Sequence, residues 1–210
     1  MSIPTDAKKD NLIPNLYSIN KKSENIKNLF ELNSSGDIIF QSKSSCLPVH
    51  FLSTLVTSEK LKTKKNFDII DSCSAPGNKT FQLSSCEQFK NSKIFAFESD
   101  EKRYATLEKR KIKLNQNNNI HTTLIDFLEV DTSDKLYENV KMIVVDPSCS
   151  ASGTFNNRLI ENLADVCCLN TAGSELEMNQ MERLKKLAMF QIKIIKKAMS
   201  FPKYFYVINC

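Results

Sequence analysis

Short apolar runs alternate along this chain with longer segments whose apolar residues recur every three or four positions. The short runs predict strands buried on both faces, and the longer segments predict amphipathic helices. Strands that alternate with helices are typical of an α/β domain with a mostly parallel sheet covered on both sides. The predicted strands are 67–71, 93–98, 120–125, 141–146 and 204–208, and the predicted helices are 79–89, 102–114 and 177–199.

The last predicted helix carries one apolar stripe, which we expect to face the core. This stripe comprises Met181, Leu184, Ala188, Ile192, Ile195 and Met199.

The N-terminal part of the chain has a weaker pattern. Residues 1–36 are rich in Lys, Asn and Ser and predict an irregular arm, which Ile38–Phe40 follows as a short strand. Apolar residues at helical spacing then predict a helix with Ser45 as its N-cap and Pro48 in its first turn. We therefore expect an arm or linker at 1–45 and one main domain at 46–210.

Composition narrows the class of protein only modestly. Of the 210 residues, 41% are apolar, and the net charge of +5 is compatible with nucleic acid without requiring it. Seven cysteines without paired CxxC spacing favour free intracellular thiols, and two scattered histidines give no reason to assign a metal. No apolar run approaches about 18 residues, so we expect no membrane span.

The first candidate site follows the first strand of the main domain, at Asp71-Ser-Cys-Ser-Ala-Pro-Gly-Asn-Lys-Thr80. Gly77 permits close backbone approach, and the helix that follows offers free amides at its N-terminus. The segment lacks GxGxxG and the phosphate-loop signature, so an ordinary strand–helix turn is the alternative.

Acidic residues end the next two strands. In doubly wound folds an acid at the position of Glu98 binds ribose hydroxyls, although a solvated carboxylate is common there too. Asp126 could reach an adenine amino group or simply cap a turn. Arg103 could cover the edge of a cofactor or only a helix face.

The second candidate site is Asp146-Pro147-Ser148-Cys149. Pro147 cannot continue a central strand, so the chain turns out at the carboxyl edge of the sheet, where the first site also lies. A carboxylate and a thiol there suit covalent attack on an electron-poor ring, and a buried loop cysteine is the alternative. Cys210, which follows the last strand, would lie near Asp146 and is a second candidate nucleophile.

Together these segments resemble the signatures of the Nop2/Sun group of RNA cytosine-5 methyltransferases. Residues 71–80 resemble the S-adenosylmethionine loop, 146–153 the second signature, 97–103 the ribose-binding strand end, and 201–210 the approach to the Thr-Cys signature. Residues 41–48 are similar to the segment before the catalytic domain in the Rcm1 branch, which modifies large-subunit ribosomal RNA.

The resemblance implies a Rossmann-like, class I S-adenosylmethionine-dependent methyltransferase fold, with a partial catalytic domain at 46–210. It implies S-adenosyl-L-methionine as cofactor, ribosomal RNA as partner with transfer RNA as the alternative, a monomer, and a nuclear or nucleolar location. Cys210 matches the nucleophile, Cys149 the cysteine that helps to release product, and Asp146 the acid that stabilises the adduct. The implied cofactor contacts are Cys73, Ser74, Ala75, Pro76, Gly77, Asn78, Lys79, Glu98, Arg103, Asp126 and Asp146.

Three departures from the family pattern bear on activity. Asn209 stands where the family has Thr, Ala151 replaces a Gly, and the sequence stops at Cys210 where the family continues. We therefore expect a chain truncated at both ends, with weak or no activity. The alternatives are a non-catalytic cofactor- or RNA-binding remnant in ribosome assembly and, less favoured because of Cys149, an amino-group methyltransferase.

Overall fold

A parallel sheet of five strands forms the centre of the computed structural model, which describes residues 4–20, 22–57, 67–114, 119–150, 175–203 and 206–209. The strand order is β5-β4-β3-β6-β7, and all four pairings are parallel. This confirms the predicted Rossmann-like class. The strands are β3 (Asp68–Asp71), β4 (Ile94–Glu98), β5 (Ile120–Leu124), β6 (Val140–Val145) and β7 (Tyr206–Asn209).

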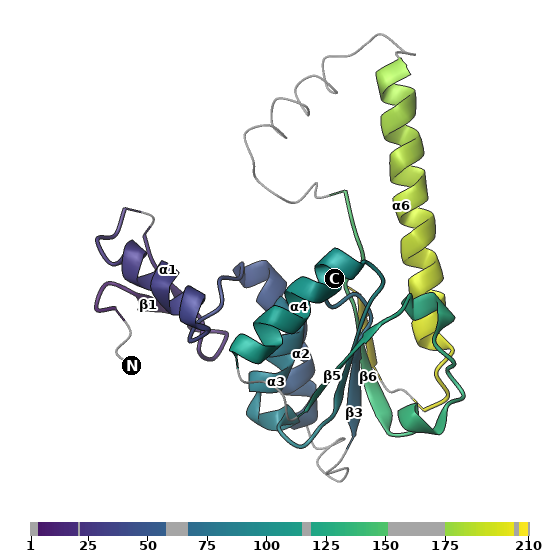
Figure 1. Ribbon diagram of the computed structural model, residues 1–210, viewed down its shortest axis with the longest axis horizontal. Coiled ribbons are helices and arrows are strands. Elements are labelled where there is room, and N and C mark those ends of the chain that lie inside the picture. Colours follow the sequence, from purple (N-terminus) through teal and green to yellow (C-terminus); the bar gives the residue numbers. More distant parts are fainter. Residues whose placement is uncertain are drawn as a thin grey trace.

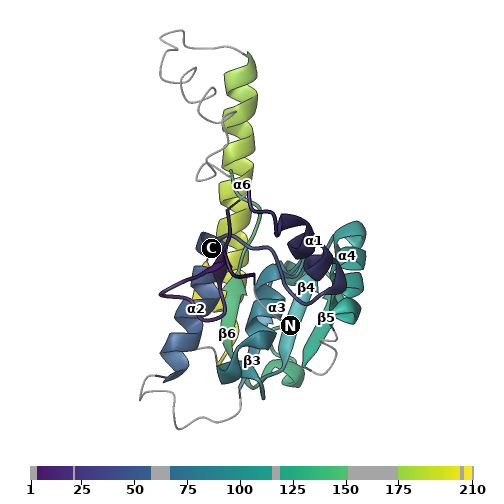
Figure 2. The ribbon, with the colours of Figure 1, turned by 90° about the vertical axis from the view of Figure 1, so that its left-hand side faces the viewer.

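Helices cover both faces of this sheet (Figures 1 and 2). On one face, α2 (Lys43–Thr57), α3 (Asn78–Ser85) and α4 (Glu101–Lys113) pack against alternate strand residues such as Ile69 and Val144. On the other face, α6 (Glu175–Met199) and the 3-10 turn η2 (Phe127–Glu129) pack against Ile70 and Val145. Because both faces are covered, the central strands are apolar throughout, as the sequence pattern predicted.

The strand order places a reversal at the centre of the sheet. From β3 the chain moves outward through β4 to β5, and it then returns to place β6 on the other side of β3. Asp71 at the end of β3 pairs in register with Val144 of β6, and Val145 pairs with Asn209 of β7. Ligand crevices form at such reversals, outside the carboxyl ends of the strands.

The N-terminal arm is more regular than we predicted. It contains an antiparallel pair, β1 (Lys8–Lys9) and β2 (Tyr17–Ser18), and a helix, α1 (Ile26–Ser35), that ends at Gly36 with a left-handed φ of 90°. The predicted strand at Ile38–Phe40 is wrong, because these residues join no strand in the described part of the chain. The Phe40 ring instead packs edge-on against Phe30, and the proposed division at residue 45 stays a prediction.

The start of α2 also differs from its prediction. Ser42 Oγ accepts a hydrogen bond from the Ser45 amide at 3.2 Å, so Ser42, and not Ser45, caps the helix. Pro48 lies inside the helix rather than in its first turn. The predicted helix 79–89 is divided into α3 and the 3-10 turn η1 (Glu87–Phe89). A further 3-10 turn, η3 (Lys135–Tyr137), precedes β6.

The prediction that this apolar stripe of α6 faces the core is wrong except for Ile195, which is partly buried against the core. Met181 and Leu184 are exposed, and the sheet is contacted instead by Ile194 and Ala198. The helix is apolar on two sides, and it extends well beyond the sheet in Figure 1, so only its C-terminal part reaches the core. None of the described helices is long and apolar enough to cross a membrane.

Candidate active site at the ends of β3 and β6

The loop at residues 72–77, between β3 and α3, is fixed by backbone contacts to strands on both sides. Ser72 N donates to Val144 O of β6 at 3.0 Å. Ser74 donates to Phe97 O of β4 from both its amide and its hydroxyl, each at 2.9 Å. A tight turn follows, in which Gly77 N donates to Ser74 O at 2.7 Å. The loop is therefore held rigidly over the carboxyl edge of the sheet.

Gly77 is required at the start of α3 by conformation and by space. Its φ is 103°, and a Cβ there would lie 2.3 Å from the Phe81 ring and 2.8 Å from Leu107. Two arginines of α4 hold the outer side of the loop, since Arg103 donates to Ala75 O at 2.5 Å and Arg110 donates to Pro76 O at 2.7 Å.

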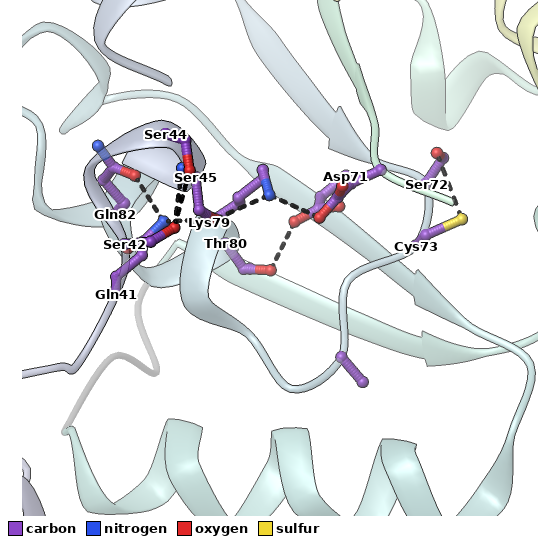
Figure 3. A network of polar contacts seen from close by, with 12 residues as sticks. Gln41, Ser42, Ser44, Ser45, Asp71, Ser72, Cys73, Lys79, Thr80 and Gln82 are labelled. Carbon is purple, nitrogen blue, oxygen red and sulfur yellow. Dashed lines mark hydrogen bonds and ion pairs between the residues drawn. The ribbon is translucent and has the colours of Figure 1, made fainter. Parts of the chain in front are cut away.

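Lys79, in the first turn of α3, connects the two candidate sites. The residue is 8% exposed, and its Nζ donates to Asp146 Oδ2 at 2.6 Å. The same Nζ donates to Ser45 Oγ at 3.0 Å (Figure 3). The Asp146 side chain is 37% exposed, so it meets the buried ammonium on one side and solvent on the other. A short charge-assisted bond of this kind fixes the orientation of the carboxylate.

Asp71 is a second carboxyl beneath the same edge. It is almost fully buried, and Thr80 Oγ1 donates to its Oδ2 at 2.7 Å. Burial raises the pKa of Asp71 to about 6, and the charge of Asp146 also acts in this direction. Its Oδ1 accepts no hydrogen bond from the described residues.

Glu98, at the end of β4, combines burial with an available oxygen. Its Oε1 accepts from the amides of Ser99 and Asp100, both at 3.0 Å. Its Oε2 accepts no hydrogen bond from the part of the chain that the structure describes, and Arg103 Nη2 lies 3.4 Å away as an ion-pair partner. This oxygen can therefore accept hydrogen bonds from hydroxyl groups of a ligand.

A family model described as 16S rRNA methyltransferase RsmB/F matches residues 58–197, which is more than half of the chain. This chain belongs to the RsmB/F family. It is 38% identical over 195 residues to "25S rRNA (cytosine-C(5))-methyltransferase rcm1" of Schizosaccharomyces pombe, covering 92% of this chain and 37% of that protein. It is 35% identical over 172 residues to a mouse "28S rRNA (cytosine-C(5))-methyltransferase", covering 81% of this chain and 32% of the mouse protein. The chain thus spans about a third of the length of these relatives.

Solved structures support the fold of this RsmB/F chain. A methyltransferase homologue from Pyrococcus horikoshii superposes with a TM-score of 0.54 at 19% identity, covering 88% of this chain and 48% of that one. NSun6 from the same organism, solved with SFG, gives 0.53 at 17% identity, covering 80% of this chain and 36% of that one.

The thiols of the RsmB/F chain differ in their surroundings. Burial raises the pKa of Cys73 to about 12, so this thiol stays protonated at neutral pH. Cys149 is exposed, three residues after Asp146. Cys210 lies outside the described residues, as do Ala151, Cys167 and Cys168, but the preceding Asn209 pairs with Val145, next to Asp146.

Asp126 takes the role that the sequence offered as its alternative. Its Oδ1 accepts from Leu128 N at 2.9 Å, which caps the 3-10 turn η2. The strand ends are nonetheless neighbours, because Ile125 N donates to Glu98 O at 2.9 Å. No group of three His, Cys, Asp or Glu in the described ranges is placed to hold a metal ion.

The predicted residues thus form two groups at one edge of the sheet. The first joins Glu98 and Arg103 to the loop carbonyl of Ala75, and the second joins Lys79 to Asp146. Sequence reasoning missed the role of Ser45, although it lies in the segment 41–48 that resembled the family. It also missed the bond from Arg110 to the loop carbonyl of Pro76, because a basic residue on a helix face gives no specific signal in the sequence.

Proposed function

We propose that this chain carries the methyl-transfer site of an RNA cytosine-C5 methyltransferase that acts on large-subunit ribosomal RNA. The observation that carries the proposal is the Asp146 carboxylate, held by buried Lys79 beside the loop at 72–77. The names of the relatives, which are 25S and 28S rRNA (cytosine-C(5))-methyltransferases, support the proposed reaction and substrate class. A substrate of this class implies a nucleolar location.

The residues around the loop fit S-adenosyl-L-methionine as cofactor. Glu98 Oε2 is a buried acceptor at the end of β4, where an acid binds the hydroxyl pair of a ribose. The rigid loop at 72–77 and the first amides of α3 would bind the rest of the molecule. When bound, the cofactor supplies a methyl group activated by a positively charged sulfur.

The chemistry requires the protein to activate a poor nucleophile, since C5 of cytosine does not react by itself. In the proposed reaction the Cys210 thiolate adds to C6 of the ring and makes C5 electron-rich. Asp146 hydrogen-bonds to N3 or N4 of cytosine and shares a proton with the adduct. C5 would then form a bond to the methyl group as the bond between that group and the cofactor sulfur breaks. Loss of the C5 proton and cleavage of the bond between the Cys210 sulfur and C6, assisted by Cys149 as base or acid, would then restore the aromatic ring.

A hollow beside the second site offers a surface for the RNA around the target base. It has a volume of about 550 Å³ and lies between Ser148 and the exposed part of α6. Its lining includes Arg183 and Lys186, which can contact phosphates, and Phe190, on which a base can stack. The target cytosine has to leave its stack to reach Asp146.

Calorimetry and a transfer assay with labelled cofactor test the proposal. We expect S-adenosylmethionine to bind in the micromolar range and the variant Glu98→Gln to bind at least about tenfold more weakly, because a charged acceptor is lost. Because the sequence predicts weak activity at most, we expect weak labelling of large-subunit ribosomal RNA and no labelling of transfer RNA.

Cysteine variants separate catalysis from binding alone. Cys210→Ser should abolish transfer, Cys149→Ala should accumulate a covalent protein–RNA adduct on a denaturing gel, and Cys86→Ala, at the far end of α3, should retain wild-type transfer. If the wild-type chain and every variant bound cofactor and RNA but transferred no methyl group, the chain would instead be a non-catalytic binding protein. Failure to bind the cofactor would overturn the proposed function.

A further inference from the structure

We propose that Ser45 of α2 is a positioning residue, whose hydroxyl holds the Lys79 ammonium against the Asp146 carboxylate. The inference rests on the proposed function and adds to it a residue outside the range 58–197 that the family model matches. Ser45 acts through Lys79, and it is not itself a catalytic residue.

The position of the Lys79 ammonium depends on two acceptors. Asp146 Oδ2 accepts from Nζ at 2.6 Å, and Ser45 Oγ accepts from it at 3.0 Å. A lysine side chain has four rotatable bonds, so one acceptor does not fix its end. Because Lys79 is 8% exposed, a donor without an acceptor there is costly, and the two bonds together define where the charge lies.

The hydroxyl of Ser45 is itself held by a small amide network. Gln41 Nε2 donates to Ser45 Oγ at 3.3 Å and to Gln82 Oε1 at 3.1 Å. Gln82 Nε2 in turn donates to Cys46 O at 3.0 Å. Figure 3 shows these side chains converging between α2 and α3. The network thus joins the two helices at the point where Lys79 passes toward Asp146.

Ser45 is not needed to start the helix, because another residue caps α2. Ser42 caps α2, and the hydroxyl of Ser45 is bonded to Lys79 and Gln41 instead. Neighbouring Ser44 is exposed, and its hydroxyl lies 3.1 Å from that of Ser42, outside this network. Ser44 therefore provides a matched control on the same turn of the helix.

Kinetics on three variants form the first part of the test. Ser45→Ala should lower kcat about tenfold, as expected for one lost bond to a charged group, and should leave the Kd for S-adenosylmethionine within about twofold. Ser45→Thr should restore kcat to within about threefold because it keeps the hydroxyl, and Ser44→Ala should match wild type. Alanine is the better helix former, so Ser45→Ala should fold.

Nuclear magnetic resonance gives a readout that does not need activity. With two acceptors, the Lys79 ammonium protons should exchange slowly with water, and Ser45→Ala should speed this exchange and shift the carboxyl carbon signal of Asp146. Ser44→Ala should change neither signal. If wild type transfers no methyl group, the proposed function fails, and these two signals alone decide whether Ser45 positions Asp146. Unchanged signals, or an unchanged kcat in Ser45→Ala, would overturn the inference.

Discussion

The loop after β3 and the loop after β6 begin at neighbouring positions of one sheet edge but are held very differently. Residues 72–77 are bonded to β6 on one side and to β4 on the other, and two arginines bond their outer carbonyls. In residues 146–150, Pro147 is buried, but Ser148, Cys149 and Ser150 are exposed. The contacts of this loop include Lys79 to Asp146 and Gln191 to Ser148 O.

The difference matches the two tasks in the proposed reaction. The cofactor is the same molecule in every cycle, so a loop fixed by the fold can bind it with little loss of conformational freedom. The target base has to be unstacked and then released as product, so the loop that meets it lies at the surface. Lys79, in the helix that follows the rigid loop, fixes the Asp146 carboxylate at the start of the exposed loop.

The largest effect should come from filling the space at Gly77. In Gly77→Ala the left-handed φ and the overlap with Phe81 and Leu107 should together lower the free energy of unfolding by about 4 kcal/mol. Urea denaturation measures this loss. Ser148→Ala, in the exposed loop, should change the free energy of unfolding by less than about 0.5 kcal/mol. Equal losses in the two loops would remove the contrast between them.

The buried carboxyl of Asp71 should make stability depend on pH. Its pKa in the folded protein is about 6, above the ordinary 3.8, so the folded state binds more protons than the unfolded state between these values. The free energy of unfolding should therefore fall as pH rises from about 4 to 6, by up to about 3 kcal/mol.

Comparison of denaturation curves with Asp71→Asn measures this contribution, because asparagine does not titrate. The variant should lack the fall in stability, and Asp37→Asn, a change away from the site, should keep it. A variant with the wild-type pH profile would show that Asp71 is ionised in the folded protein throughout this range.

The bond from Thr80 to Asp71 should have a smaller effect. Thr80→Val keeps the shape of the side chain but removes the donor at 2.7 Å, which should cost about 2 kcal/mol at pH 7. The loss should be smaller at pH 4, where the carboxyl is protonated. Thermal unfolding at the two pH values checks both statements, and a larger loss at pH 4 would contradict them.

The smallest effect should come from the exposed side. Arg183→Ala removes one candidate phosphate contact from the hollow beside Ser148, so RNA affinity should fall by a few-fold, and the slope of log affinity against log salt should become less steep by about 0.7. Titrations with RNA at several salt concentrations measure both quantities. Lys109→Ala, on α4, should leave affinity and slope unchanged, and a similar loss in both variants would argue for unspecific attraction.

Local sequence patterns were sufficient for much of the fold. The apolar runs of β3, β4 and β6 predicted buried parallel strands because both of their faces are covered. Pro147 correctly ended a central strand, since proline has no amide hydrogen to donate to the sheet. Glu98 and Asp146 were predicted at strand ends from these patterns, and the structure brings each to the same edge of the sheet.

Other features depend on which segments meet in space, and these are decided by the tertiary structure alone. The sequence cannot tell which of two apolar sides α6 turns to the sheet, because both satisfy the same helical period. Lys79 and Asp146 are 67 residues apart, and only the placement of β6 beside β3 brings them together. Serine is a common residue type at helix N-caps, so the sequence predicted this role for Ser45. Only the packing of α2 on α3 makes it a partner of a buried ammonium. The chain by itself thus determined its strands and candidate residues, whereas the order of the strands determined which of those residues share a site.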